Sequence, residues 1–167
     1  IVVPSSAGTI ICTDQAIAPL GVLAGVEFVD SVTGKTTFKN YWPGSNAVSV
    51  DTDFPVKAFV HDDPMQLYVV VADGTNTNRA TALADTFINC DMASVNNGST
   101  ATGRSSDMLD ISTAATTNTL DVRIVGLYED AANADYSAAG HQYIVRLNGH
   151  FNSGTTIAVG TFATTGI

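Results

Sequence analysis

The fold is decided by residues 21–41, which read GVLAGVEFV, DSVTGK and TTFKNY in succession. Residues 21–29 are apolar and rich in β-branched and aromatic side chains, which favours a strand over a helix. Residues 30–34 have the composition of a turn, and Gly34 suits the positive φ that many turns require. Residues 36–41 return to strand-forming side chains. The stretch therefore predicts a β-hairpin.

The same pattern of short strands and turns continues along the chain. Proline cannot donate to a β-ladder, so Pro43 and Pro64 are expected to end strands. We expect five more strands, of which the second is the most apolar and is predicted to run through the core: residues 55–61, 65–72, 86–90, 120–128 and 141–149. Residues 79–85 are short and rich in alanine, and we interpret them as a loop or a single turn.

Two of these strands alternate clearly between apolar and polar side chains. In residues 120–128 we expect one face to carry Leu120, Val122 and Ile124 and the other Asp121 and Arg123. In residues 141–149 we expect one face to carry Tyr143, Val145 and Leu147.

These patterns predict an all-β fold, an antiparallel sandwich or barrel of about eight strands. Residues 1–20 are expected to form an extended N-terminal arm, residues 21–150 the β domain, and residues 151–167 a C-terminal strand or arm. Residues 96–106 have almost no apolar side chain and predict a long polar loop, a feature that usually has a function.

Composition excludes several classes of protein. The chain has 167 residues and a net charge of −9, with only 14% charged and 45% hydrophobic residues. Its seven basic residues are scattered, which disfavours nucleic-acid binding. Its apolar runs are far shorter than the ~20 residues of a membrane span, and no signal peptide is expected. The chain begins with Ile1, so we expect that residues before it are missing or were removed. Abundant Thr, Ala, Ser and Asn suit a secreted, shell-forming or extracellular β protein.

No sequence motif predicts catalysis, a cofactor or a metal site. Residues 61–63 (HDD) could bind a cation, but a turn capped by the aspartates is the favoured interpretation. Residues 73–78 offer oxygen ligands without the spacing of a calcium loop, so a turn is favoured there too. His141 and His150 flank one strand and could share a site only if that strand were bent. We therefore expect that the protein is not an enzyme.

Three further residue types leave alternatives open. Cys12 and Cys90 predict two small buried thiols, with one disulfide as the alternative. Asn97 begins a formal glycosylation sequon, which often occurs by chance. Trp42 could be a sugar platform, but a half-buried position at a strand end is favoured.

The N-terminal segment is unusually apolar for a segment that precedes the first hairpin. Residues 1–4 (IVVP) and 9–12 (TIIC) are hydrophobic, and free apolar arms are costly in water. One hypothesis is that residues 1–20 pack on a partner or on a sister subunit. The alternative is an edge strand of the same domain.

Four segments in succession resemble a known family. They are residues 21–34, residues 38–44 (FKNYWPG), residues 56–64 (VKAFVHDDP), and residues 102–110 followed by 120–133 and 144–150. Together they resemble the capsid decoration (cement) proteins of tailed bacteriophages, particularly of podophages. The resemblance implies a β-rich, non-enzymatic virion protein that binds the outer surface of the capsid. Such proteins, often homotrimers, bridge neighbouring major capsid subunits and resist the pressure of packaged DNA.

On this interpretation the partners are the major capsid protein and further copies of the chain, with no nucleic acid, no membrane and no cofactor. Residues of types that anchor interfaces supply the candidate contacts. These candidates are Ile1, Val2, Val3, Ile10, Ile11, Tyr41, Trp42 and Arg104. The alternative function is another virion or surface β protein, such as a head-fibre base, a tail component or a carbohydrate-binding module.

Overall fold

The computed structural model describes residues 1–12, 18–44, 46–94, 98–99 and 101–153. In this part of the chain 42% of the structure is strand and 8% helical, which confirms the all-β prediction. The elements are β1 (Val2–Pro4), β2 (Ile10–Cys12), β3 (Val22–Val29), β4 (Thr36–Lys39), β5 (Lys57–His61), β6 (Tyr68–Val71), α1 (Arg79–Ala84), β7 (Asn89–Ser94), β8 (Asp107–Ala115), β9 (Val122–Leu127), the 3-10 helix η1 (Ala131–Asn133), β10 (Gln142–Leu147) and the 3-10 helix η2 (Phe151–Ser153).

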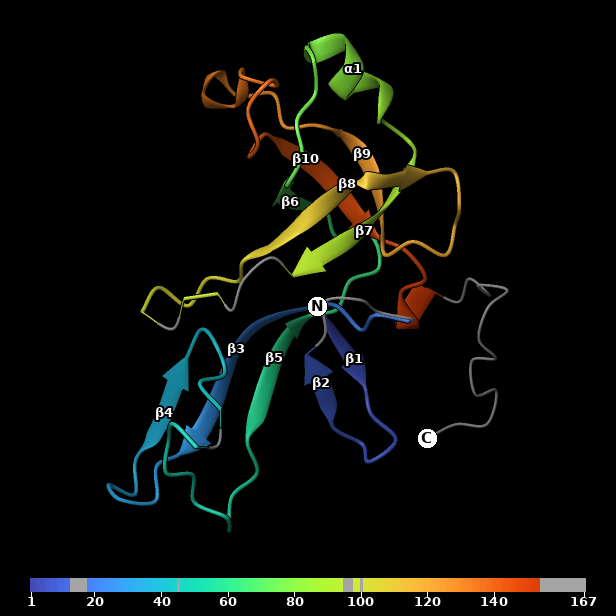
Figure 1. Ribbon diagram of the computed structural model, residues 1–167. Coiled ribbons are helices and arrows are strands. Elements are labelled where there is room, and N and C mark those ends of the chain that lie inside the picture. The colour runs from blue at the N-terminus through green and yellow to red at the C-terminus, as the bar shows by residue number, and fades with distance from the viewer. Residues whose placement is uncertain (13–17, 45, 95–97, 100, 154–167) are drawn as a thin grey trace.

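The largest sheet has five strands in the order β6-β10-β9-β7-β8 and occupies the upper half of Figure 1. Its two edges approach each other, because Ala72, just after β6, forms a parallel bridge with Leu109 of β8. The Asp73 N–H donates to the Leu109 carbonyl at 3.0 Å. The sheet is therefore curled into a partly closed barrel.

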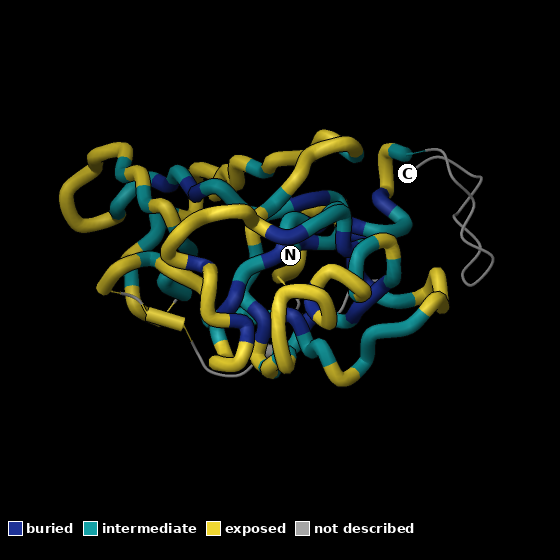
Figure 2. Tube along the Cα trace, turned by 90° about the horizontal axis from the view of Figure 1, so that it is seen from above, coloured by how far each residue is buried: buried dark blue, intermediate teal, exposed yellow. Residues whose placement is uncertain are grey.

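The main hydrophobic core lies inside this barrel. Tyr143, Val145 and Leu147 of β10 are all buried and face it, as their alternation predicts. Val122 and Ile124 of β9 do the same. In Figure 2 the buried residues concentrate at the centre of the molecule and the exposed ones lie around it. The period-2 pattern of these two strands thus specifies which face is interior.

Two smaller antiparallel sheets lie in the lower half of Figure 1. One has the order β4-β3-β5, and its β3–β4 pair is the predicted hairpin. The other is the β1–β2 hairpin. Val2 of β1 bridges Gly21 at the start of β3, with the Val2 N–H donating to the Gly21 carbonyl at 2.9 Å. The N-terminus is thereby held beside the three-stranded sheet.

The prediction of a loop or single turn at residues 79–85 was wrong, because α1 is a six-residue helix. Asn78 caps it by accepting hydrogen bonds from the N–H groups of Ala80 and Thr81, and the Thr81 hydroxyl accepts from the Asn78 N–H. This capping box uses threonine where glutamate or glutamine is usual. For this reason the N-terminal cap of α1 was not predicted from the sequence.

The strand predicted at residues 65–72 does not run through the core. Only Tyr68–Val71 forms a strand, β6, and Val69 on it is 51% exposed. A short continuous apolar run does not reveal which faces are covered. Asp121 is a second correction, since it is buried rather than on an outer face, and it accepts a hydrogen bond from the Met92 N–H at 3.0 Å.

Two strands differ from the sequence interpretation in position. The strand expected at residues 86–90 is β7, displaced to Asn89–Ser94. β8 was not anticipated, because Leu109 is its one deeply buried residue and most of its other side chains are small or polar. The described residues of the predicted polar loop, 98–99 and 101–106, lie between these two strands.

Candidate interaction surfaces

The outer face of the three-stranded sheet carries two exposed phenylalanines. Phe38 of β4 is 61% exposed and Phe59 of β5 is 44% exposed, and their ring centroids lie 5.9 Å apart. Both flank β3, since Phe38 is in register with Glu27 and Phe59 with Gly25. We call this surface, defined by Phe38 and Phe59, the phenylalanine face. Exposed aromatic pairs of this kind are typical of interaction sites.

Gly25 lets the Phe38 ring lie close to β3. A Cβ atom added at Gly25 would come within 2.5 Å of the Phe38 ring and 2.9 Å of the Lys39 carbonyl oxygen. Beside the rings, the Lys57 ammonium contacts the Glu27 carboxylate at 2.9 Å, with 64% and 31% of the side chains exposed. An exposed pair of this kind contributes little stability, but it neutralises the charge of the face.

The opposite face of the same sheet is covered by the chain itself. Val26 and Phe28 of β3 are buried there. The Trp42 indole meets the Phe28 ring edge-on, with centroids 6.0 Å apart and planes at 85°. Trp42 is half-buried at the end of the strand, whereas the Lys39 ammonium lies 5.7 Å from the ring centroid of the neighbouring Tyr41.

The structure brings the loop of Arg104 close to this strand end. A Cβ added at Gly103 would lie 2.5 Å from the Asn40 side chain, so the loop packs directly against the residue before Tyr41. Ser99 and Arg104 form an isolated bridge that closes the loop, and Arg104 is exposed. Three candidate contact residues from distant parts of the sequence, Tyr41, Trp42 and Arg104, therefore belong to one region.

The N-terminal candidates divide into two groups. Val2 is fully buried, and Ile1 packs against the barrel core. Their positions correspond to an edge strand of the same domain, the second alternative for this segment. Ile11 on β2 is instead 54% exposed, and Ile10 is partly exposed. Contact of Ile10 and Ile11 with a partner stays a prediction. Residues 13–17, in the middle of the predicted arm, lie outside the described residues.

A second exposed apolar surface was not singled out in the sequence. Met65, Leu67 and Val69 are 66%, 48% and 51% exposed, and they lie on or just before β6. We call these three residues the outer strip. Val69 is in register with Ile144 of β10, whose neighbours Tyr143 and Val145 point inward, so Val69 and Ile144 face outward together. Residues 67–70 (LYVV) are all apolar, so no polar alternation in the sequence marks the exposed face.

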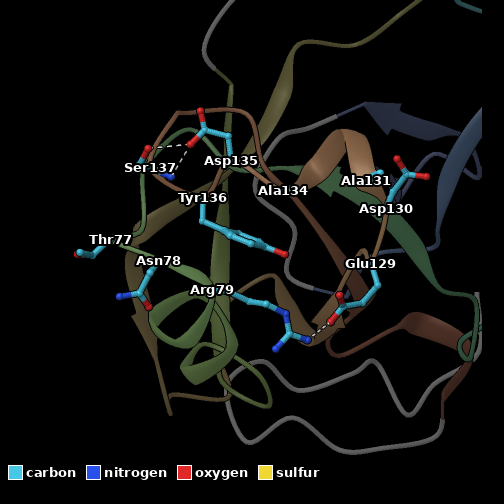
Figure 3. A pocket seen from close by; sticks show the side chains of 10 residues that line it. All are labelled: Thr77, Asn78, Arg79, Glu129, Asp130, Ala131, Ala134, Asp135, Tyr136 and Ser137. Atoms are coloured by element: carbon cyan, nitrogen blue, oxygen red, sulfur yellow. Dashed lines mark hydrogen bonds and ion pairs between the residues drawn. The ribbon is translucent and has the colours of Figure 1, made fainter.

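An open depression of about 640 Å³ lies at one end of the barrel, between the residues before α1 and the β9–β10 connection. Figure 3 shows the Tyr136 ring across its middle and Arg79 reaching towards Glu129, with which it forms an ion pair. That pair is exposed on both sides. Asp135 is held by the Ser137 N–H and hydroxyl, at 3.1 and 2.7 Å, and these bonds lower the pKa of its carboxyl.

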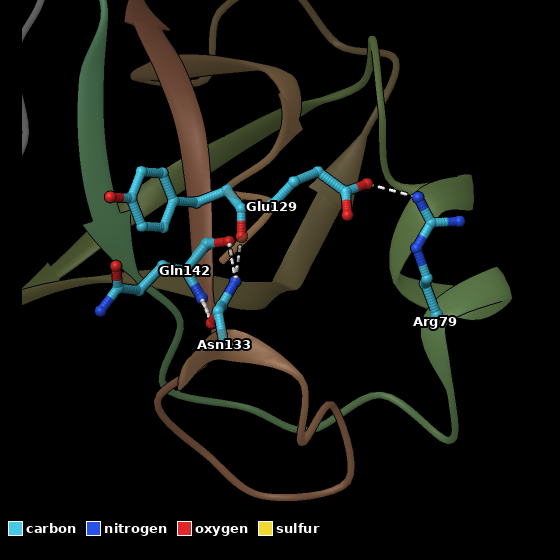
Figure 4. Close-up of polar contacts among 5 residues, drawn as sticks. Arg79, Glu129, Asn133 and Gln142 are labelled. Atoms are coloured by element: carbon cyan, nitrogen blue, oxygen red, sulfur yellow. Dashed lines mark hydrogen bonds and ion pairs between the residues drawn. The ribbon is translucent and has the colours of Figure 1, made fainter. Parts of the chain in front are cut away.

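A partly buried polar cluster lies next to the depression, since the Asn76 N–H donates to the carbonyl of Tyr136 in its lining at 2.8 Å. The Asn76 amide donates to the Tyr143 hydroxyl (2.8 Å) and to Asp85 (3.1 Å), and the Tyr143 hydroxyl donates to Asp85 (2.7 Å). Burial and then Asp85 raise the pKa of Tyr143, so its hydroxyl stays protonated. The cluster is well satisfied by internal partners, which is typical of a structural network. In Figure 4, Asn133 similarly ties the β9–β10 connection to Gln142.

The remaining residues singled out in the sequence do not form a binding or catalytic site among the described residues. Asp63 accepts from the Met65 N–H at 2.8 Å, as expected of a turn. His141 precedes β10 and His150 follows it, so they lie at opposite ends of the strand. Cys90 is a buried thiol as predicted, but the prediction of two buried thiols was wrong for Cys12, which is exposed on β2, and neither forms a disulfide. Asn97 lies outside the described residues, as do residues 154–167 of the predicted C-terminal segment.

Within the part of the chain that the structure describes, no group of three or more His, Cys, Asp or Glu side chains is placed to hold a metal ion. Among the same residues, no helix has the length and apolarity needed to cross a membrane. Comparison with known proteins finds no matching family model, no matching curated protein and no matching solved structure.

Proposed function

We propose that the protein is a capsid decoration protein. It binds the outer surface of a bacteriophage capsid as a homotrimer and bridges neighbouring major capsid subunits. The observation that carries the proposal is the presence of two separate exposed apolar surfaces, the phenylalanine face and the outer strip. Such surfaces suit a protein that acts by adhesion. The specific assignment to a capsid comes from the family that four segments of the sequence resemble.

Charge and composition are consistent with this location. A chain with a net charge of −9 is repelled by packaged DNA, which favours the outer side of the shell. Surfaces rich in threonine, serine and asparagine can be buried with a modest desolvation cost. Symmetry repeats each modest contact, so the combined affinity of a trimer exceeds that of one site by orders of magnitude.

The candidate capsid contacts are Ile11 and Arg104, which are exposed, and Tyr41, which is partly exposed. They lie outside both the phenylalanine face and the outer strip. Tyr41 and Arg104 belong to one region, whereas Ile11 lies on β2 of the separate β1–β2 hairpin. Aromatic and arginine side chains are enriched at interface anchors. These residues are therefore the ones to alter in a binding test.

The test compares capsids that lack the protein with the same capsids after its addition. We expect co-sedimentation of the protein with the particles and a higher temperature of DNA release. The double variant Ile11→Thr/Arg104→Ala is expected to bind less, whereas Val32→Thr, an exposed position in a turn, is the matched control. An unchanged DNA-release temperature with saturating protein would refute the proposal.

A carbohydrate-binding module is the second candidate, and the depression beside α1 favours it. Its walls combine an aromatic ring, Tyr136, with hydrogen-bonding side chains such as Arg79, Asn78 and Glu129. Saccharides are recognised by this combination of apolar and polar groups. A rise in melting temperature with a soluble glycan, abolished by Arg79→Ala, would favour this function over capsid binding.

A further inference from the structure

A buried histidine, His150, lies where three segments of the chain meet. It stands between β10 and η2 and is 2% exposed. The Phe151 N–H donates to the Pro19 carbonyl at 2.8 Å, and the Asn152 side-chain amide donates to the Asp62 carbonyl at 3.5 Å. Residues 150–153 therefore join the end of the barrel to the segment before β3 and to the segment after β5.

The hydrogen bonds of the imidazole ring fix where its proton lies. A backbone N–H can only donate, and the Asn152 N–H donates to His150 Nδ1 at 3.1 Å. Nδ1 therefore carries the lone pair, and the hydrogen of the neutral ring is on Nε2. Nε2 is buried and has no hydrogen-bond partner among the described residues. A second proton enters the ring only at Nδ1, and its entry removes the hydrogen bond from Asn152.

The groups around the ring do not compensate for a charge on it. The carboxylates of Asp62 and Asp63 and the Leu20 carbonyl favour the charged form, but burial outweighs them and lowers the pKa of His150. Residues 19–20 and 151–153, which pack against the ring or flank it, carry no titratable side chain. The buried ring therefore binds a proton less readily than the same ring in water does.

The segment can leave its place without opening the barrel. The end of β10 has anchors of its own, because Asn148 donates its N–H to the Asp121 carbonyl at 2.8 Å and its side-chain amide to the Leu120 carbonyl at 2.9 Å. Gly149, with a φ of +57°, turns the chain between these anchors and His150. Residues 150–153 take part in none of the strand pairs of β10. Their release therefore breaks no strand pair of the barrel.

We propose that His150 is a pH-sensitive switch. In mild acid a proton from the solvent binds to Nδ1 and displaces the Asn152 N–H. Residues 150–153 are then released from residues 19–20 and from Asp62, while the barrel stays folded. This switch goes beyond the proposed function and does not depend on binding to a capsid.

The direction and size of the pH effect follow from the single proton. The closed arrangement is most stable above about pH 6.5, the usual pKa of histidine, and weakens as the pH falls below it. The ratio of open to closed molecules rises by at most about tenfold per pH unit. Between pH 7.5 and pH 5 the rise is therefore up to about 30-fold.

Amide hydrogen exchange followed by NMR measures this ratio residue by residue, after correction for the pH dependence of exchange in an unfolded peptide. We expect the protection of the Phe151 and Asn152 amides to fall by up to about 30-fold from pH 7.5 to pH 5. The Ile124 N–H, which donates to the Ile88 carbonyl in the barrel at 3.0 Å, should stay protected. Nitrogen shifts of the ring at pH 7.5 should place the hydrogen of His150 on Nε2.

His150→Asn is the matched control. An asparagine oxygen accepts a hydrogen bond from the N–H two residues later and does not titrate, so protection at Phe151 should be the same at both pH values. His150→Gln replaces this control if circular dichroism shows that His150→Asn does not fold. If neither variant folds, the wild-type comparison of Phe151 with Ile124 decides. Protection at Phe151 that is independent of pH in the wild type, an equal fall in the control, or a fall shared by Ile124 would each overturn the inference.

Discussion

At the scale of single residues, His150 is a buried base whose ionisation opposes folding. It is 2% exposed, and its Nδ1 accepts a hydrogen bond from the Asn152 N–H at 3.1 Å. Burial lowers its pKa below the usual value, although the charges of Asp62 and Asp63 and the Leu20 carbonyl act in the opposite direction. The folded protein therefore binds this proton less readily than the unfolded chain does.

This difference predicts a loss of stability in mild acid. Below about pH 6.5 the unfolded chain binds a proton at this histidine more readily than the folded protein does. The free energy of unfolding is therefore highest above that pH and declines as the pH falls. The slope is at most about 1.4 kcal/mol per pH unit, because one proton is involved. Urea unfolding of the wild type and of His150→Asn between pH 7.5 and 5 should show a smaller slope for the variant. Val32→Thr, at an exposed position without a titratable group, should keep the slope of the wild type.

The two cysteines are expected to differ strongly in reactivity. Burial raises the pKa of Cys90 to about 11, and its thiol donates to the Asp110 carbonyl at 2.8 Å. Cys12 is exposed on β2. Because the thiolate is the reactive form, a disulfide reagent at pH 8 should modify Cys12 rapidly and Cys90 only after unfolding. Cys12→Ser should abolish the fast phase. Equal rates for both thiols in the wild type would contradict the placement of Cys90.

At the scale of elements, Gly21 is where β1, β3 and β5 meet. Its φ is +151°, and a Cβ there would lie 2.0 Å from the backbone oxygen of His61. Gly21→Ala should therefore force the strands apart and cost several kcal/mol, on the order of 3 kcal/mol or more. Gly34→Ala is the control, since Gly34 has a φ of +66° in open space and should cost only about 1 kcal/mol. Urea unfolding of both variants measures the difference.

The elements that the sequence predicted well are those with one buried face. In β10, the buried residues Tyr143, Val145 and Leu147 alternate with neighbours that are only partly buried, so period and burial agree. The prediction that residues 65–72 run through the core was wrong because Val69, Val70 and Val71 are equally apolar, although β6 is an edge strand of its sheet. Burial of an apolar run depends on what the rest of the chain places over it, and local sequence carries no such information.

The candidate surfaces were predictable only in part for the same reason. Tyr41, Trp42 and Arg104 were chosen by residue type, and their proximity depends on the contact between Gly103 and Asn40. Phe38 and Phe59 belong to predicted strands, but their exposure became evident only when β3 was placed between β4 and β5. Register across strands from distant segments is a property of tertiary structure.

At the scale of the whole molecule, the N-terminus connects the small sheets to the barrel. Val2 is hydrogen-bonded to Leu20 and Gly21, at 2.8 and 2.9 Å, while Ile1 packs against the barrel core. Phe151, after β10, donates its N–H to the Pro19 carbonyl at 2.8 Å. Segments from both ends of the described chain thus meet at residues 19–21, so the stability of the parts is expected to be coupled.

Val2→Ala tests this coupling against the hypothesis of a free N-terminal arm. Val2 is 0% exposed, so its truncation should lower the free energy of unfolding by about 1–3 kcal/mol, through lost burial and the cavity left behind. Ile11→Ala removes a larger side chain at a 54% exposed position and should change stability by less than about 0.5 kcal/mol. Urea unfolding gives both values. An arm that served only to bind a partner would instead leave the stability of the isolated chain unchanged in both variants, and Val2→Ala would then weaken assembly alone.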